Sequence, residues 1–275
     1  MPMIEPRLQT IVCSRLQVAY FESGSGEPLV LVHGGESSCL QFVELMPYLG
    51  EGIRAIAYDQ RDSGLTVSGD EPYVVADLAS DLAAFIESLG VERAHVLGTS
   101  FGGMVALHAA LDHPEQIASV ILVATVPSAS LLGEVVGNIT TMSPEARREA
   151  LINGLYTPAG LAADPDLSER GRRVLIERTP DQMSRRLASV RDHHVTDRLS
   201  EMTTRTLVLH GTDDPLAPFS AAELMAVTIP GATLRPIEGA RHGVASEFPA
   251  EVAAIVREFL GLGPNVAQDP TDGSP

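Results

Sequence analysis

The chain contains no tryptophan and only two cysteines, Cys13 and Cys39, among its 275 residues. Nothing in the number or spacing of these cysteines suggests a disulfide framework, and they do not form a Cys-x-x-Cys pair for a metal or for redox chemistry. We therefore expect both thiols to be buried as small apolar side chains.

Long apolar runs are absent as well. No stretch reaches the roughly 18 to 20 apolar residues that are needed to cross a bilayer. Residues 1–10 lack the positively charged start and the apolar segment of a signal peptide. These two absences predict a cytoplasmic protein that does not insert into a membrane.

Positive charge is scarce, because 19 Lys and Arg residues stand against 36 Asp and Glu residues, which gives a formal net charge of −17. Nucleic acid and an anionic membrane surface would both be repelled by such a chain, so we expect neither as a partner. The composition leaves the oligomeric state open, and a homo-oligomer is compatible with it.

Hydrophobic residues make up 44% of the chain, enough to bury one large core that carries a subdomain. Over residues 1–125, short apolar runs alternate with helical patterns. Two strands are predicted within residues 8–23, and strands covered on both faces are predicted over 28–32, 53–58 and 117–124. This alternation is typical of an α/β fold with a mainly parallel sheet and helices on both faces, so we assign 1–125 to the first part of the core.

The alternation stops over residues 126–200, which we interpret as a cap of three or four helices inserted into the core. Helix starts are predicted at Ser143-Pro144-Glu145 and at Thr179-Pro180-Asp181-Gln182. Each has a hydroxyl cap, a proline in the first turn and acidic residues at the positive end of the helix dipole. A third helix is predicted over 165–177, and no strand is expected in the insertion.

The core resumes over residues 201–262, where a strand is predicted over 206–210. The pattern Ser220-x-x-Glu223 is interpreted as a capping box that opens the next helix. Residues 263–275 are rich in Gly, Pro, Asn and Asp and contain almost no apolar residues. This composition predicts a disordered tail.

A strand predicted over 94–98 ends in Gly98-Thr99-Ser100-Phe101-Gly102, and an apolar helix follows at once. This is the Gly-x-Ser-x-Gly pattern of a nucleophile elbow. A serine at such a sharp turn has a strained backbone, and side chains at Gly98 and Gly102 would collide there. Because the chain has 24 glycines, the pattern alone is equally typical of an ordinary Gly/Ser turn.

Two loops that follow later strands offer a base and an acid for Ser100. His242 lies in the loop over 239–243, and we predict that it is the general base. The acid of this motif is expected between Ser100 and His242 in the chain. We assign it to Asp214, which would hold the imidazole tautomer and stabilise the imidazolium; Asp213 is the alternative.

The segment His33-Gly34-Gly35 follows the strand over 28–32 and matches the motif that supplies one N–H group of an oxyanion hole. We predict that the backbone N–H groups of Gly35 and Phe101 are the two donors. The alternative for this segment is a plain glycine turn. Glu36, the next residue, is expected to be solvated.

With these loops in this order, the chain resembles the α/β-hydrolase superfamily over residues 8–262. The resemblance implies an eight-stranded, mostly parallel sheet whose second strand is antiparallel, with a helical cap over the site. Within the superfamily the chain looks closest to small bacterial esterases, enol-lactonases and polyketide methylesterases. The matching segments are His33-Gly34-Gly35, Asp59–Gly64, Gly98–Gly103, Gly211-x-x-Asp214-x-x-x-Pro218 and Gly239–His242.

The chain departs from the family pattern at two points. Many relatives have glycine where Asp62 stands, although Asp59 and Arg61 are still expected to brace this turn. Relatives that cleave carbon–carbon bonds tend to place an arginine and a tryptophan over the pocket. This chain has no tryptophan, and the arginines available as carboxylate contacts are Arg185, Arg186 and Arg191.

The resemblance implies a serine hydrolase that cleaves a carboxylic ester or lactone of a small, largely apolar molecule, without a metal or an organic cofactor. The alternatives are a carbon–carbon bond hydrolase or cofactor-free perhydrolase on the same triad, and a non-catalytic protein that binds a ligand. An apolar acyl group would suit a cap built from Leu131, Leu132, Val135, Val136, Leu151, Ile152, Leu155 and Leu161.

Overall fold

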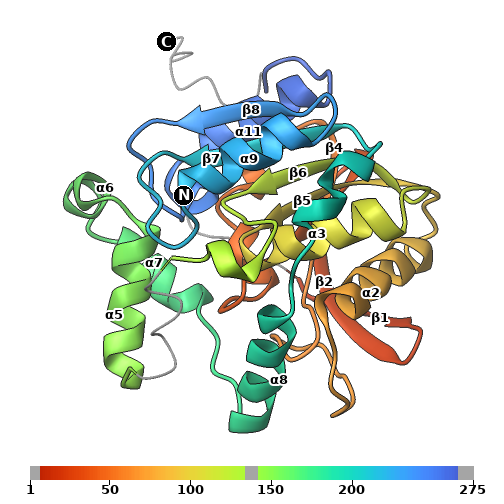
Figure 1. Ribbon diagram of the computed structural model, residues 1–275, viewed down its shortest axis with the longest axis horizontal. Helices are drawn as coiled ribbons and strands as arrows, with labels where there is room; N and C mark the ends of the chain where they lie inside the picture. The colour runs from red at the N-terminus through yellow and green to blue at the C-terminus, as the bar shows by residue number, and fades with distance from the viewer. Residues whose placement is uncertain (1–6, 134–141, 266–275) are drawn as a thin grey trace, which may run out of the picture.

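The apolar runs form the strands of one sheet in this computed structural model, which describes residues 7–133 and 142–265 (Figure 1). The strands are β1 (Gln9–Cys13), β2 (Leu16–Gly24), β3 (Gly26–Val32), β4 (Gly52–Tyr58), β5 (Ala94–Thr99), β6 (Ile117–Val123), β7 (Thr206–Gly211) and β8 (Thr233–Ile237). Their spatial order is β1-β2-β4-β3-β5-β6-β7-β8. Only β2 runs antiparallel to both of its neighbours, and every pair from β4 and β3 to β7 and β8 is parallel. The predicted eight-stranded, mostly parallel sheet is therefore confirmed.

The central strand β3 shows why these runs are apolar throughout. Val30 and Val32 belong to the core on one face of the sheet, Leu29 and Leu31 belong to the core on the other face, and all four are fully buried. The first face is covered by α2 (Val75–Ser88), α3 (Phe101–Asp112) and α9 (Phe219–Thr228). The second is covered by α1 (Met46–Leu49), α10 (Val244–Glu247) and α11 (Pro249–Phe259). Short 3₁₀ helices are η1 (Cys39–Phe42), η2 (Ala129–Leu131) and η4 (Thr196–Glu201).

Among the described residues, four α-helices lie between β6 and β7 in the insertion, which we call the cap (Figure 1). They are α5 (Pro144–Leu155), α6 (Pro158–Ala163), α7 (Leu167–Val174) and α8 (Pro180–Arg191). Ser143 caps α5, and Thr179 and Gln182 form a capping box at the start of α8, as predicted. The third helix is shorter than the predicted 165–177, because the chain is extended again at Leu175, which bridges to Ser37.

Some helix boundaries differ from those predicted from the sequence. Ser220 and Glu223 do not form a capping box, because Pro218 precedes the first turn of α9, which already begins at Phe219, and no side chain caps this helix. The sequence gives no position for the fourth described helix of the cap, α6, whose start is capped by Thr157. Val135 and Val136 lie outside the described residues, as do residues 266–275 of the predicted tail.

The two cysteines are buried and free, as predicted. Burial, together with the nearby carboxylate of Asp81, raises the pKa of the Cys13 thiol to about 11. Among the helices of the described residues, none is long and apolar enough to cross a membrane.

Candidate active site

Ser100 stands at the sharp turn between β5 and α3. Its backbone has φ 52° and ψ −118°, a left-handed conformation that is strained for a residue with a side chain. Two hydrogen bonds hold the turn: the Ser100 N–H donates to Val123 O at 2.8 Å, and Thr125 Oγ1 donates to Ser100 O at 2.7 Å. The elbow predicted from the sequence is thus present as a backbone structure.

The glycines on either side of Ser100 have no room for a side chain. A Cβ atom on Gly98 would stand 2.2 Å from Gly102 O, and a Cβ atom on Gly102 would stand 2.0 Å from Val32 O. Both obstacles are backbone atoms of the sheet and of the helix that follows, which cannot move aside cheaply. Steric exclusion therefore requires glycine at both positions.

Gly102→Ala is expected to lower the free energy of unfolding by about 3 kcal/mol, because the new methyl group overlaps the β3 backbone. Urea denaturation of the variant and the wild type measures the difference. Gly263→Ala is a matched control, since nothing lies within 4 Å of a Cβ atom there, and it should change the value by no more than about 0.5 kcal/mol. Equal stability of the two variants would contradict the steric argument.

Asp214 and His242 form a buried pair. His242 Nδ1 donates to Asp214 Oδ2 at 2.7 Å, and Asp214 Oδ1 accepts from the N–H groups of Leu216 and Ala217 at 2.8 and 2.9 Å. Burial by itself raises the pKa of Asp214, but the charge of His242 and the hydrogen bonds from His210 and His242 outweigh it and hold the pKa well below its usual range. The carboxylate is therefore ionised and oriented toward the imidazole.

The neighbouring Asp213 is exposed, and the structure does not bring its side chain to His242. Its backbone N–H donates to Ala240 O at 3.0 Å, which ties the acid loop to the histidine loop. Of the two aspartates considered from the sequence, Asp214 is the one that contacts the imidazole.

A second histidine at the acid was missed by the sequence analysis. His210 is fully buried at the end of β7, where its Nε2 donates to Ala217 O at 2.7 Å and lies 3.3 Å from Asp214 Oδ2. It thus contacts the same carboxylate oxygen that binds His242. The only signal in the sequence is its position four residues before Asp214, at the end of a strand.

The end of the cap helix α5 holds the loop of His242. The N–H groups of His242 and Gly243 donate to Gly154 O and Leu155 O at 3.2 and 2.7 Å, and Arg241 Nη1 donates to Asn153 O. The last carbonyl groups of a helix need such donors. These bonds therefore tie the loop of His242 to the cap.

The turn His33-Gly34-Gly35 is fixed from two sides. Gly34 N–H donates to Gln41 Oε1 at 2.8 Å, and Gln41 Nε2 donates to Thr99 Oγ1 at 2.9 Å. On the other side His33 Nδ1 donates to Gly34 O at 2.8 Å. None of these bonds uses the N–H of Gly35. Gln41 was not identified from the sequence, because nothing in its local pattern distinguishes it from an ordinary polar residue.

The predicted site residues line one cavity of about 170 Å³. Ser100, His242, Gly34, Gly35 and Phe101 all form part of its wall. Asp214 lies behind His242 and reaches the cavity only through the imidazole. The structure therefore brings together the proposed nucleophile, base, acid and oxyanion loop around one space.

The remainder of the wall is mostly apolar and includes cap residues. Of the cap side chains considered from the sequence, Leu132, Leu151 and Leu155 line the cavity. Ile152 and Leu161 pack inside the cap itself, and Leu131 packs against the core. Within the described ranges, no group of three or more His, Cys, Asp or Glu side chains is arranged to hold a metal ion.

Comparison with known proteins agrees with this geometry. Residues 29–255 match the sequence model of a family described as "Alpha/beta hydrolase family". The chain belongs to the alpha/beta hydrolase family.

Three relatives of this hydrolase illustrate the range of the family. A proline iminopeptidase of Lactobacillus helveticus is 30% identical over 272 residues, which cover 87% of this chain and 91% of the relative. A protein of Variovorax paradoxus, provisionally named a carbamate hydrolase, is 31% identical over 250 residues, which cover 86% and 91%. A thermophilic esterase from Thermogutta terrifontis has a solved structure that superimposes with a TM-score of 0.79 at 25% identity, over 93% of this chain and 98% of that one. The chain is thus similar to hydrolases whose names indicate different scissile bonds.

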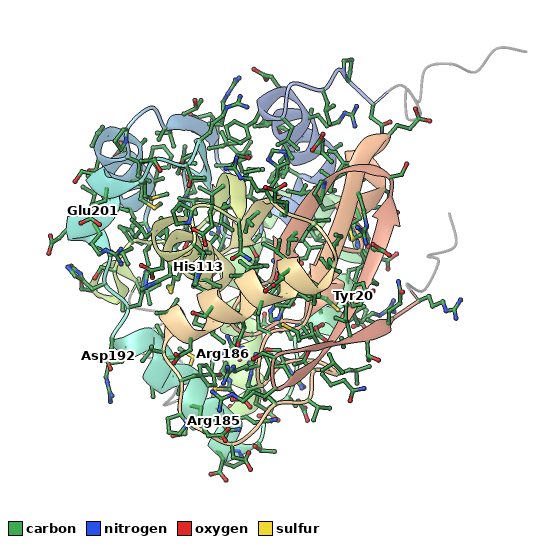
Figure 2. All side chains as sticks on the ribbon, turned by 90° about the vertical axis from the view of Figure 1, so that its right-hand side faces the viewer. Tyr20, His113, Arg185, Arg186, Asp192 and Glu201 are labelled. Carbon is green, nitrogen blue, oxygen red and sulfur yellow. The ribbon has the colours of Figure 1, made fainter. Side chains whose placement is uncertain are left out.

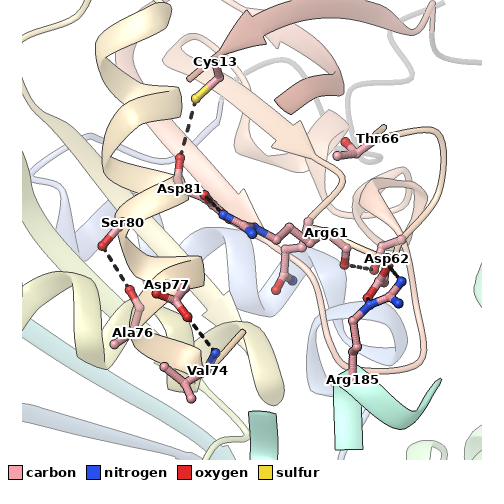
Figure 3. A network of polar contacts seen from close by, with 12 residues as sticks. Cys13, Arg61, Asp62, Thr66, Val74, Ala76, Asp77, Ser80, Asp81 and Arg185 are labelled. Atoms are coloured by element: carbon pink, nitrogen blue, oxygen red, sulfur yellow. Dashed lines mark hydrogen bonds and ion pairs between the residues drawn. The ribbon is translucent and has the colours of Figure 1, made fainter. Parts of the chain in front are cut away.

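Asp62 fits into the turn over Asp59–Gly64 through its backbone conformation and its side-chain contacts. This residue has φ 55°, a left-handed conformation that aspartate tolerates better than most residues. Its carboxylate accepts two hydrogen bonds from Arg185 of α8, at 2.9 and 2.8 Å (Figure 3). The side chain that replaces glycine therefore ties the turn to the cap.

Asp59 and Arg61 brace the same turn, as expected. Asp59 accepts from the N–H groups of Cys39 and Leu65 at 2.7 and 2.8 Å. Arg61 forms a two-bond ion pair with Asp81 of α2 (Figure 3). These contacts fix the turn to the core helices that lie beside it.

Glu36 differs from expectation, and the three candidate arginines differ from one another in their surroundings. Glu36 is not fully solvated, because its side chain is 24% exposed, lines the cavity and lies 3.9 Å from Arg178 Nη1. Of the three arginines considered as carboxylate contacts, Arg185 is paired with Asp62 and Arg191 lies in solvent at 76% exposure. Only Arg186 lines the cavity.

Proposed function

We propose that this hydrolase cleaves carboxylic esters or lactones of small, largely apolar molecules through Ser100, His242 and Asp214. The observation that carries the proposal is the buried 2.7 Å contact between Asp214 and His242, with His242 and the strained Ser100 on the wall of the same cavity. An oriented acid, a histidine and a serine on a sharp turn are the parts that nucleophilic acyl transfer needs.

In the proposed reaction His242 takes the proton of Ser100 Oγ as that oxygen attacks the ester carbonyl carbon. The carbonyl oxygen becomes an oxyanion, which accepts hydrogen bonds from the N–H groups of Gly35 and Phe101. The tetrahedral intermediate collapses, the alcohol leaves with the proton from His242, and the acyl group stays on Ser100. Water, deprotonated by His242, then releases the carboxylic acid and restores Ser100.

The walls of the cavity support an apolar acyl group. Leu151 and Leu155 of α5, Leu132 ahead of α5, and Val190 of α8 face this space. Contact with such side chains gains free energy in proportion to the apolar area of the substrate that leaves water. We therefore propose a neutral acyl chain as the part of the substrate that these residues bind.

A second candidate is hydrolysis of an amide bond next to an amino group. It is favoured by the similarity to a proline iminopeptidase and by Glu36, the acidic side chain on the cavity wall. A carboxylate there could bind an ammonium group. Both reactions would use the same serine chemistry, so only the preferred substrate distinguishes the two candidates.

A matched panel tests the proposal. We expect turnover of p-nitrophenyl butyrate and of a simple lactone, with kcat/KM at least about 100-fold above that for proline p-nitroanilide, because an apolar wall rejects a charged amine. Faster turnover of the anilide would favour the second candidate. If no ester, lactone or amide is turned over, the carbon–carbon and non-catalytic alternatives gain support.

A further inference from the structure

The side chain of Arg186 belongs to the cap but contacts the core. It extends from α8, next to Arg185 (Figure 2), and is only 2% exposed. Its Nη2 donates to Arg61 O and Ser63 Oγ at 2.7 and 2.8 Å. Within the part of the chain that the structure describes, no carboxylate lies within 4.0 Å of its guanidinium. A buried cation without an ion pair is costly, so its position calls for a role.

One side of the guanidinium faces Phe101. The central carbon lies 4.3 Å from the centroid of the Phe101 ring, close enough for a cation–π contact. Phe101 follows the nucleophile directly, and a Cβ atom on Gly35 would stand 3.5 Å from Phe101 Cβ. Arg186 therefore touches the residue whose N–H is proposed as one oxyanion donor and which packs against the other.

The other side of the guanidinium reaches the oxyanion turn through Gln60. Arg186 Nη1 donates to Gln60 Oε1 at 3.4 Å, which sets the orientation of that amide. Gln60 Nε2 then donates to His33 O at 2.7 Å, and Gln60 N–H donates to His33 Nε2 at 3.2 Å. His33 completes the chain by donating from Nδ1 to Gly34 O.

This chain of bonds requires a neutral His33, because Nε2 must accept while Nδ1 donates. His33 is fully buried, and burial, followed by the charge of Arg186, lowers its pKa well below the usual value. Arg186 thus favours the protonation state of His33 that the bonds require.

We propose that Arg186 is a positioning residue for the oxyanion hole: it couples the cap helix α8 to Phe101 on one side and to the Gly34-Gly35 turn on the other. This inference rests on the proposed function, because it assumes that these N–H groups bind an oxyanion. Arg186 acts through Phe101, Gln60 and His33, and not through contact with the reacting atoms.

The competing role is recognition of a carboxylate on the substrate. Guanidinium groups usually bind carboxylates through two parallel N–H bonds. Both hydrogens of Nη2 are already directed at protein oxygens, and Nη1 points to Gln60. Nε is buried and has no hydrogen-bond partner among the described residues, but with both Nη2 hydrogens engaged it has no free neighbour for a second, parallel bond. The contacts therefore favour positioning over substrate binding.

The test compares Arg186→Lys with Arg191→Lys, an exposed control on the same helix. Active sites are counted with a fluorophosphonate, and kcat and KM per labelled site are measured with p-nitrophenyl butyrate and with the anionic ester mono-p-nitrophenyl succinate. We expect Arg186→Lys to lower kcat about 10- to 100-fold for both esters with KM nearly unchanged, as a small misplacement of catalytic groups does. Arg191→Lys should behave as wild type.

Other results would contradict either the positioning role of Arg186 or the proposed function. Unchanged kcat per labelled site in Arg186→Lys overturns the positioning role, and so does a rise in KM confined to the anionic ester. If Arg186→Lys does not fold by circular dichroism, Gln60→Met must show the same loss of kcat, and wild-type kcat in that variant also overturns the role. A wild-type protein that is neither labelled nor active overturns the proposed function itself.

Discussion

Replacing Ser100 by alanine is expected to lower kcat/KM for p-nitrophenyl butyrate at least about 10⁴-fold. The reason is that the variant cannot form an acyl-enzyme, and only the oxyanion donors and substrate binding are left to assist water. The fold should survive, because Ser100 Oγ makes none of the hydrogen bonds that hold the elbow. Steady-state kinetics together with a urea denaturation curve separates loss of chemistry from loss of structure.

Ser80→Ala is a matched control for this prediction. Ser80 lies exposed on α2, where its hydroxyl donates to Ala76 O (Figure 3), and its loss should leave kcat/KM within about twofold of wild type, as is usual for surface substitutions. The double variant Ser100→Ala/His242→Ala should be no less active than Ser100→Ala alone, because residues that act as one unit are not additive. A further large loss would mean that His242 acts independently of Ser100.

Asp214→Asn is expected to lower kcat about 10³- to 10⁴-fold while changing KM little. The amide can donate a hydrogen bond where the carboxylate only accepts, so it favours the tautomer of His242 that cannot take the proton of Ser100. The backbone bonds from Leu216 and Ala217 are to Oδ1, so the variant can keep the loop conformation. Asp213→Asn, one residue earlier and exposed, is the control and should retain wild-type kcat.

The pH dependence of the same two proteins checks the assignment. The pKa of Asp214 is held well below its usual range, so its carboxylate stays ionised down to about pH 4 and keeps its contact with His242. Asp213→Asn should therefore have the same pH profile of kcat/KM as the wild type, whereas Asp214→Asn, which lacks the carboxylate, should have a changed profile. Unchanged profiles in both variants would contradict a role of the Asp214 carboxylate in the reaction.

The sequence predicted the parts of the site that depend on position along the chain. Strand ends of a parallel sheet meet at one edge, so Ser100, Asp214, His242 and the His33-Gly34-Gly35 turn could be placed together from their order alone. The sequence places the acid in the loop after the 206–210 strand, with Asp214 preferred and Asp213 as the alternative, and the structure shows that Asp214 contacts the histidine.

Most of the residues that sequence reasoning missed act through long-range contacts. Gln41 and Gln60 have no distinctive pattern around them, and each reaches Thr99 or His33 only when separate segments pack together. The contact of His210 with Asp214 is local, but nothing in the pattern distinguishes this histidine from a packed one. Arg186 is 126 residues from Gln60 along the chain, so no local signal could link the two. The predicted start of α9 was wrong for a local reason, because Pro218 and not Ser220 precedes the first turn of this helix.

The most direct test of the account is the site of covalent labelling by a fluorophosphonate, read by mass spectrometry of peptides. We predict one phosphonyl group per wild-type protein, on Ser100, with esterase activity lost in proportion to the label. Ser100→Ala should take up none, and Asp214→Asn should be labelled far more slowly, because its histidine no longer activates the serine. Esterase activity that persists in fully labelled protein, or a label on another residue, would contradict the account.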